Sequence, residues 1–233
     1  MEIDHSSPER QAASTQSLTT PNAFWQMRKG RRIALRPILP QDGPLLGAMI
    51  AGLSPTSKRN RCHGAVNEFS AARLHQMSCV DHKRHVAFVV TADGPNQKQC
   101  VIAEARYVVD EQGASDSAEF AIVVDDQWVR QGLGEQCMNA LMTKASQDGL
   151  RWLHGDVLAQ NRPMLALMKR CHFFCTPDRH DGDVIHAEIL LSQVQSRYME
   201  TTRSWLQKIS SWRKRISAHV QQRPWGDIHA NHV

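Results

Sequence analysis

Residues 120–142 change from the periodicity of a strand to that of a helix across one short turn. The first part, FAIVV, is a run of apolar and β-branched residues, which is typical of a buried strand. The turn leads to Gly132-Leu133-Gly134, after which apolar residues recur at helical spacing until Gly149 ends the pattern. The sequence therefore predicts a strand, a glycine turn and a helix over 133–149.

Glycines at the start of a helix have a chemical consequence. They let a ligand approach the backbone closely, and the unpaired N–H groups and the helix dipole attract an anion such as phosphate. The alternative is a tight turn without a ligand. The sequence has no GxxxxGK[ST] loop, which excludes a Walker site. It also has no GxGxxG near its first strand with an acidic residue about 20 residues later, so little in it supports a dinucleotide site.

The elements before the glycine turn predict a meander of neighbouring antiparallel strands. Strands are expected over 85–93, 100–110 and 117–126, separated by the turn signals DGPN and EQGAS. Further upstream we expect a strand from Arg31 to about Pro37, a helix over 42–52 capped by Asp42, a basic loop over 54–64 and a helix over 70–78.

After the glycine turn, strands and helices alternate. We expect strands over 150–158, 172–175 and 183–192, and a helix over 162–171. A meander followed by this alternation predicts a mixed α/β fold, in which helices flank a central mixed, mostly antiparallel sheet.

Charge is unevenly distributed along the 233 residues, whose formal net charge is +5. Residues 1–36 carry +3 and residues 197–233 carry +5, so the part between them carries −3. Because residues 1–24 are rich in Ser, Thr, Gln and Pro, we predict a flexible tail over 1–29. One folded domain over 30–192 and a basic amphipathic helical extension over 193–233 complete the predicted organisation.

The extension has apolar residues at steps of three and four, which are Trp205, Ile209, Trp212, Ile216 and Val220. We expect this face to dock either on the folded domain or on a second copy of the chain. The second arrangement would form a homodimer. An anionic membrane surface or a nucleic acid is the alternative partner for its basic residues, and the acidic middle of the chain makes nucleic acid the weaker choice.

Composition also predicts a location. Six cysteines in 233 residues are too few for a disulfide scaffold, and the N-terminus lacks an apolar leader. No stretch approaches the roughly 20 apolar residues that a membrane span needs. We therefore expect a cytoplasmic protein with reduced thiols and no membrane span.

The segment around the glycines resembles the signature of the GNAT family of acyl-CoA-dependent N-acyltransferases. That signature, [RQ]-x-x-G-x-[GA], follows a strand and opens a helix, and this chain has VRQGLG over 129–134. The preceding VVDDQW is similar to the family's V-x-P-x-[WY] approach. Asn161 and the following RPMLALMKRCHFF are similar to its N-x-x-[AM]-x-x-[LYF]-x-x-x-G-F segment. The resemblance covers residues 30–192.

More narrowly, LSPTSKRNR (53–61) and SAEFAIVV (117–124) look like the GNAT domain of bacterial protein-lysine acetyltransferases. The resemblance implies transfer of acetyl from acetyl-CoA to a primary amine by direct attack on the thioester, without a metal. The acceptor would be a protein lysine or a small molecule. The alternative is a catalytically weak module that senses acyl-CoA or binds a partner.

The resemblance also implies which residues hold the cosubstrate. Arg130 would add a charged contact to the CoA pyrophosphate. The backbone N–H groups that would cradle this pyrophosphate belong to Gln131, Gly132, Leu133, Gly134 and Glu135.

The thioester arm would lie along the strand before the glycine turn. Ile122 and Val124, on a strand that splays from its neighbour, would hold the pantetheine and polarise the thioester carbonyl. Asn161 would hydrogen-bond the same arm. Glu119 is the candidate general base, and the alternative is that it is an exposed strand residue without a catalytic role.

Three residues depart from the family's pattern. Val129 stands where the signature has Arg or Gln, so one polar contact is missing. Met168 stands where many members have a Tyr general acid, and His172 stands where Gly usually precedes Phe. The leaving thiolate would then take its proton from water or from the ammonium product, with His172 as a substitute donor.

A cluster near the end of the chain invites a zinc site. Cys171-His172, Cys175 and His180 carry metal-binding side chains, but their spacing is not that of a standard zinc site. We expect core cysteines at these positions rather than metal ligands.

Overall fold

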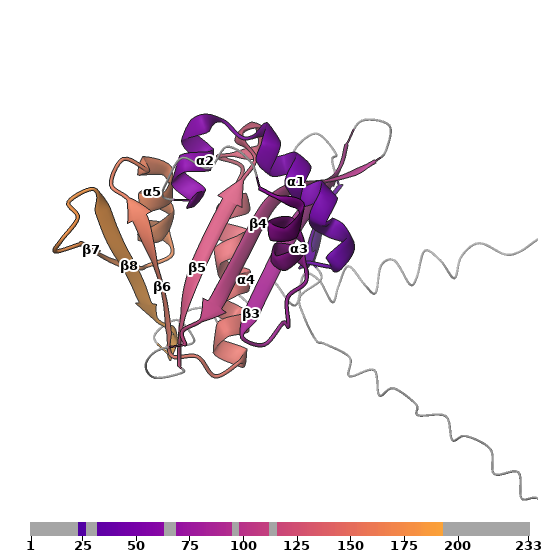
Figure 1. The fold of residues 1–233 in the computed structure, drawn as a ribbon. Coiled ribbons are helices and arrows are strands. Elements are labelled where there is room, and N and C mark those ends of the chain that lie inside the picture. Colours follow the sequence, from indigo (N-terminus) through magenta and orange to yellow (C-terminus); the bar gives the residue numbers. More distant parts are fainter. Residues whose placement is uncertain (1–22, 27–31, 63–68, 95–97, 112–115, 193–233) are drawn as a thin grey trace, which may run out of the picture.

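The computed structural model describes residues 23–26, 32–62, 69–94, 98–111 and 116–192. Within them, eight strands form one sheet in the order β1-β2-β3-β4-β5-β6-β8-β7 (Figure 1). The strands are β1 (Ala23–Gln26), β2 (Arg32–Pro37), β3 (His85–Asp93), β4 (Gln99–Val109), β5 (Ser117–Val124), β6 (Trp152–Leu158), β7 (Phe174–Pro177) and β8 (Val184–Leu190). The predicted extension over 193–233 and its amphipathic helix lie outside the described residues.

Helices cover both faces of the sheet. In Figure 1, α1, α2 and α3 lie in front of it and α4 lies behind it. The helices are α1 (Gly43–Gly52), α2 (Pro55–Cys62), α3 (Ala71–Ser78), α4 (Leu133–Gln147) and α5 (Arg162–Arg170), with the short 3-10 helices η1 (Pro40–Asp42) and η3 (Asp126–Trp128).

Alternating side chains of the central strands fill two apolar cores. Phe120 on β5 belongs to the larger core, with Met138 and Leu141 of α4. Val123, on the same strand, points to the opposite face and packs in the smaller core with Ile50 of α1. A strand buried on both faces shows few polar positions, as the sequence of β5 does.

Neighbouring strands run antiparallel, except that β5 and β6 run parallel. Strand β6 follows β5 through the crossover helix α4, which a parallel pair requires. The mixed, mostly antiparallel sheet flanked by helices that the sequence predicts is therefore confirmed.

The segment over 54–64, predicted to be a loop, instead contains helix α2. Its start carries two helix signals, because Ser54 Oγ accepts the Ser57 N–H at 3.2 Å and Pro55 is the first helical residue. Basic and polar residues fill the helix, so no apolar period announces it.

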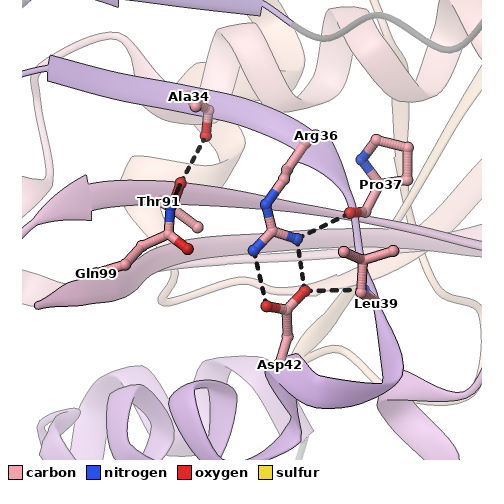
Figure 2. Close-up of polar contacts among 7 residues, drawn as sticks. All are labelled: Ala34, Arg36, Pro37, Leu39, Asp42, Thr91 and Gln99. Carbon is pink, nitrogen blue, oxygen red and sulfur yellow. Dashed lines mark hydrogen bonds and ion pairs between the residues drawn. The ribbon is translucent and has the colours of Figure 1, made fainter.

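Asp42 precedes α1 as predicted, but its side chain does not cap the helix. Its two oxygens instead accept hydrogen bonds from the Arg36 guanidinium at 2.6 and 2.7 Å, and Oδ2 also accepts the Leu39 N–H at 2.8 Å (Figure 2). The buried carboxylate thus closes the turn between β2 and α1, and the charged partner explains why the helix N–H groups do not hold it.

Two boundaries differ from the sequence prediction. Strand β1 lies inside the range 1–29 predicted as a flexible tail, so the sheet begins earlier in the chain than expected. Strand β7 starts at Phe174 rather than His172, because α5 ends at Arg170 and Cys171 and His172 form the turn that follows it.

Candidate functional site

The glycine turn has the geometry of an anion cradle. Arg130 and Gly132 have positive φ angles of 61° and 85°, and Gly132 is the residue that precedes α4. The first backbone hydrogen bond of the helix runs from Gln136 N–H to Gly132 O at 3.1 Å. The N–H groups of the first turn therefore lie before the helical ladder and face the approach to the helix.

The two glycines serve different needs. A Cβ added to Gly132 would meet nothing within 4 Å, so this position needs glycine for its φ angle and not for space. A Cβ added to Gly134 would lie 3.2 Å from Cδ2 of Leu167 on α5. Gly134 thus lets α5 pack closely against the start of α4.

The sheet opens next to this cradle. Strands β5 and β6 pair only over Ser117–Glu119 and Trp152–His154, although both strands continue beyond these residues. Figure 1 shows the two strands diverging toward the end where α2 lies. A Cβ added to Gly155, the first β6 residue past the pairing, would lie 3.0 Å from the Phe120 carbonyl oxygen. Glycine is therefore required where the strands part.

The open edge of β5 exposes particular backbone groups. The Asp125 N–H donates to Ile102 O of β4 at 2.9 Å, and the Asp110 N–H donates to Ser117 O at 3.0 Å. Backbone groups alternate in direction along a strand, so odd-numbered residues of β5 face β4. Those of Ile122 and Val124 therefore face the opening, while the Ile122 side chain is buried in the larger core.

Asn161 begins α5 at the end of the opening. Its Oδ1 accepts the Met164 N–H at 3.2 Å, so the carbonyl side of the amide caps the helix. Within the described contacts, the amide nitrogen donates to no protein atom and remains a donor for a ligand.

The side chains of the cradle point to different surroundings. Leu133 is buried in the core, so only its backbone can meet a ligand. Glu135 forms an ion pair with Arg170 of α5 at 3.5 Å, and the Gln131 side chain donates to Gln127 O at 3.2 Å. Arg130 is exposed.

Glu119 lies at the point where β5 and β6 separate. It is exposed and stands opposite His154 of β6, the last pair before the opening. His154 Nε2 lies 2.9 Å from an oxygen of Asp110, and its ring lies 5.7 Å from that of His186 on β8. Asp110 also accepts a hydrogen bond from Ser117 Oγ. Glu119, His154 and His186 thus form a row of ionisable side chains across the sheet, and Asp110 contacts the row at His154.

This row escaped the sequence analysis, although a signal was present. His154 and Asp156 occupy alternate positions in WLHGDVL, as His186 and Glu188 do in VIHAEIL. Alternation places each pair on one face of its strand. The register then brings His154 opposite Glu188 and Asp156 opposite His186, where His186 Nδ1 lies 3.0 Å from Asp156.

A buried charge network holds α2 and α3 on the same face as Glu119. Glu104 of β4 is fully buried and binds Arg106 Nε, while Arg61 of α2 lies 3.3 Å from its second oxygen. Arg106 also donates to Met77 O at 3.1 Å and lies 2.9 Å from His85 Nε2. Burial alone would raise the pKa of Glu104, but the two guanidinium groups hold it below its ordinary value.

The three departures from the family's pattern have structural reasons. Met168 is fully buried in the core, so no proton donor stands at this position. His172 has a φ of 63° and follows α5, where Phe173 N–H binds Met168 O at 2.9 Å. This is the helix end at which glycine is preferred. Val129 is 46% exposed and offers a ligand no polar group.

Of the two cysteines expected in the core, Cys171 is buried, whereas Cys175 lies exposed on the short strand β7, so that part of the prediction is wrong. Burial raises the pKa of Cys171 to about 11. Within the described residues, no group of three or more His, Cys, Asp or Glu side chains is arranged to hold a metal ion. None of the described helices is long and apolar enough to cross a membrane.

The opening suits an elongated ligand with an anionic group. Free N–H groups and a left-handed glycine stand at one end, an unpaired strand edge follows, and an exposed carboxylate lies where the strands part. These features fit the pyrophosphate and the amide-containing arm of acetyl-CoA.

Comparisons with known proteins agree with this geometry. Residues 56–173 match the Acetyltransferase (GNAT) family. Acetyltransferase PA5475 of Pseudomonas aeruginosa is 30% identical over 161 residues, which cover 67% of this chain and 83% of that protein. Mycothiol acetyltransferase of Thermobifida fusca is 39% identical over 103 residues, which cover 44% of this chain and only 29% of that protein.

Two solved structures share the fold. The GNAT domain of S. lividans PAT has a TM-score of 0.64 at 21% identity and covers 72% of this chain and 96% of its own. The yncA protein of Salmonella typhimurium, solved with its cofactor acetyl-CoA, has a TM-score of 0.54 at 14% identity, covering 68% and 94%. The chain belongs to the GNAT family of acetyltransferases and is an acetyl-CoA-dependent N-acetyltransferase.

Proposed function

We propose that this enzyme transfers acetyl from acetyl-CoA to a primary amine, with the ε-amine of a protein lysine as acceptor. The observation that carries the proposal is the opening between β5 and β6, which runs from the N-terminus of α4 to the exposed Glu119. The N-terminus of α4, the unpaired edge of β5 and the carboxylate of Glu119 support the proposal together, because the reaction needs a phosphate site, a thioester site and a base.

The cradle binds the pyrophosphate of CoA. Its donors are the backbone N–H groups from Gln131 to Glu135, which precede the helical ladder of α4, and the positive end of the helix dipole adds to them. Arg130 is exposed beside the cradle and adds a charge-assisted hydrogen bond. Acetyl-CoA supplies the activated thioester to the reaction.

The free edge of β5 positions the pantetheine arm of acetyl-CoA. The backbone groups of Ile122 and Val124 face the opening and hydrogen-bond the pantetheine amides, and the Asn161 amide nitrogen donates from the far side. A backbone N–H on this edge stabilises the negative charge that develops on the carbonyl oxygen.

Glu119 acts as the general base. It takes a proton from the acceptor ammonium, directly or through one water, so that the neutral amine can attack. The amine nitrogen forms a bond to the carbonyl carbon and the carbon–sulfur bond breaks. The nitrogen of the resulting intermediate is positively charged and gives up one proton as the bond to sulfur breaks. The departing thiolate takes up this proton, directly or by exchange through water, since Met168 offers none.

Two observations support a lysine acceptor. The segments LSPTSKRNR and SAEFAIVV, similar to bacterial protein-lysine acetyltransferases, form α2 and β5 at the opening. The exposed face beside Glu119 also carries the carboxylates of Asp156 and Glu188. Carboxylates favour an approaching ammonium group.

An acceptor screen tests the proposal. The wild-type chain is incubated with acetyl-CoA and, separately, small amines, lysine peptides and a protein extract, and products are identified by mass spectrometry. We expect acetylated lysine, and at least a hundredfold lower turnover in Glu119→Gln, since a general base contributes about 10² to 10⁴ in rate. Acetylation of small amines alone would overturn the lysine proposal, and CoA binding without any product would favour a sensing module.

We also propose three features outside the site. Residues 30–192 form the catalytic domain, and the amphipathic extension over 193–233 docks its apolar face on a second copy. A cytoplasmic location is supported by the composition, because six cysteines in 233 residues are too few for a disulfide scaffold. Light scattering of the full chain and of residues 1–192 tests the dimer, which only the full chain should form.

A further inference from the structure

Helix α2 is attached to the sheet at both of its ends. At its C-terminal end, Arg61 lies 3.3 Å from the buried Glu104 of β4. Glu104 stands directly opposite Val123 of β5, which lies in the unpaired half of that strand. This end of α2 is therefore fixed beside the strand that borders the opening.

The N-terminal end of α2 is attached to Asp126. Both carboxylate oxygens are used, since Oδ2 accepts the Ser54 N–H at 2.7 Å and Oδ1 accepts the Ser57 hydroxyl at 2.5 Å. Burial alone would raise the pKa of Asp126, but these hydrogen bonds lower it, so the group is a carboxylate at neutral pH. A carboxylate at a helix N-terminus also complements the helix dipole.

Asp126 occupies a particular place along the chain. It lies in η3, two residues after the end of β5 and six before Gly132. The same short segment thus carries the end of the thioester strand, the attachment of α2 and the approach to the phosphate cradle. We expect a movement of α2 to displace this segment as well, because both oxygens of the Asp126 carboxylate are bonded to residues at the start of α2.

We propose that Asp126 is a positioning residue, which couples α2 to the phosphate cradle and fixes α2 beside the unpaired half of β5, on the side from which the acceptor approaches. This inference rests on the proposed function, because it takes the opening as the acetyl-CoA site. It assigns Asp126 no contact with the reacting atoms.

Hydrogen exchange tests the coupling in the full chain. The variants are Ser57→Ala, Asp126→Asn and both together. The control is Asp125→Asn, because Asp125 accepts the Gln127 N–H at 2.8 Å in the same turn and no α2 group. Exchange of residues 54–62 and 130–136 is measured by mass spectrometry with and without acetyl-CoA, and affinity for acetyl-CoA by calorimetry.

In the wild type and in Asp125→Asn, we expect acetyl-CoA to slow exchange in both segments. In Asp126→Asn and Ser57→Ala, the slowing persists in 130–136 but is lost in 54–62, and affinity changes by less than about threefold. With an acceptor from the screen, the acceptor KM rises about fivefold while kcat stays within twofold, as expected for a lost hydrogen bond of about one kcal/mol. The double variant matches Asp126→Asn, since the hydrogen bond that Ser57→Ala removes is one of the two that Asp126→Asn already disturbs.

Retained protection of 54–62 in Asp126→Asn would overturn the inference. The inference would also be overturned if exchange of α2 in the variants were faster by the same factor with and without acetyl-CoA. That result would mean that Asp126 has a structural role alone. If the wild type binds no acetyl-CoA in calorimetry, the proposed function itself fails and the coupling fails with it. Binding in the wild type with unchanged variants refutes the coupling alone.

Discussion

Glu104 is the only carboxylate in the described network that it forms with Arg61 and Arg106. Replacing it by Gln removes that negative charge. Glu104 is fully buried, and it binds Arg106 and Arg61, whose side chains are 8% and 15% exposed. Glutamine has the same shape, but it leaves two guanidinium groups in the interior without a negative partner. Removing one member of a buried ion pair costs about 3 to 5 kcal/mol, a large share of the 5 to 15 kcal/mol that stabilise a typical domain.

Urea unfolding followed by circular dichroism measures this loss. Glu119→Gln is the matched control, because Glu119 is an exposed carboxylate on the neighbouring strand β5. This substitution should change the free energy of unfolding by less than about 0.5 kcal/mol. Arg61→Met should restore part of the loss when combined with Glu104→Gln, since one buried cation is then gone. A loss under about 1 kcal/mol in Glu104→Gln would refute the reasoning.

Four further predictions follow from the geometry. Because the pKa of Glu104 lies below its ordinary value of 4.5, its contribution is complete above that pH and is lost as the pH falls below it, so acid should destabilise Glu104→Gln less steeply than the wild type in urea titrations between pH 6 and pH 3. His172→Gly should raise stability by about 1 kcal/mol and the melting temperature by about 2 to 4 °C, since it relieves a left-handed φ; an unchanged calorimetric midpoint would count against this. Gly155→Ala should cost about 1 to 3 kcal/mol in chemical unfolding because its Cβ would meet Phe120, and neutrality would show that the strands can move apart freely. Gly132→Ala should weaken acetyl-CoA binding in calorimetry, whereas Gly52→Ala, equally open but with an ordinary φ, should not; equal affinities would contradict the role of the turn.

The sequence predicted those elements whose signal is local. Strand β3 ends where DGPN ends its apolar run, and α4 ends at Gln147, just before the predicted stop at Gly149. Both signals reside in consecutive residues that bury one face. The glycine turn was predictable for the same reason, because its spacing within one segment already marks a helix start.

Helix α2 could not be predicted in this way. Its residues are polar and basic, and its ends are held by Asp126 and Glu104, which lie 69 and 43 residues further along the chain than Ser57 and Arg61. Asp42 likewise prefers the Arg36 guanidinium to the helix N–H groups that local rules assign to it. Polar partners outside the helix decide such positions, whether they lie six residues away, as Arg36 does, or much further along the chain, and local helix rules do not show them.

The opening between β5 and β6 is a relation between two strands that pair for only three residues each. Neither strand carries a local sign of the separation except Gly155, whose role depends on Phe120 across the gap. The family resemblance, rather than periodicity, therefore led to Ile122, Val124 and Asn161. The row of His154 and His186 was within reach of alternation, but only the register brings the two strands together.

The central claim is that acetyl-CoA binds along the open edge of β5 with its pyrophosphate on the first turn of α4. A ¹H–¹⁵N correlation spectrum of the wild-type chain, titrated with acetyl-CoA, reports on each amide separately. The account predicts the largest shifts at Gln131, Leu133, Gly134 and Glu135, with further shifts at Ile122 and Val124 and small ones at Tyr107 on the adjacent strand. Unchanged amides in the glycine turn at millimolar acetyl-CoA, or shifts confined to another face of the sheet, would contradict it.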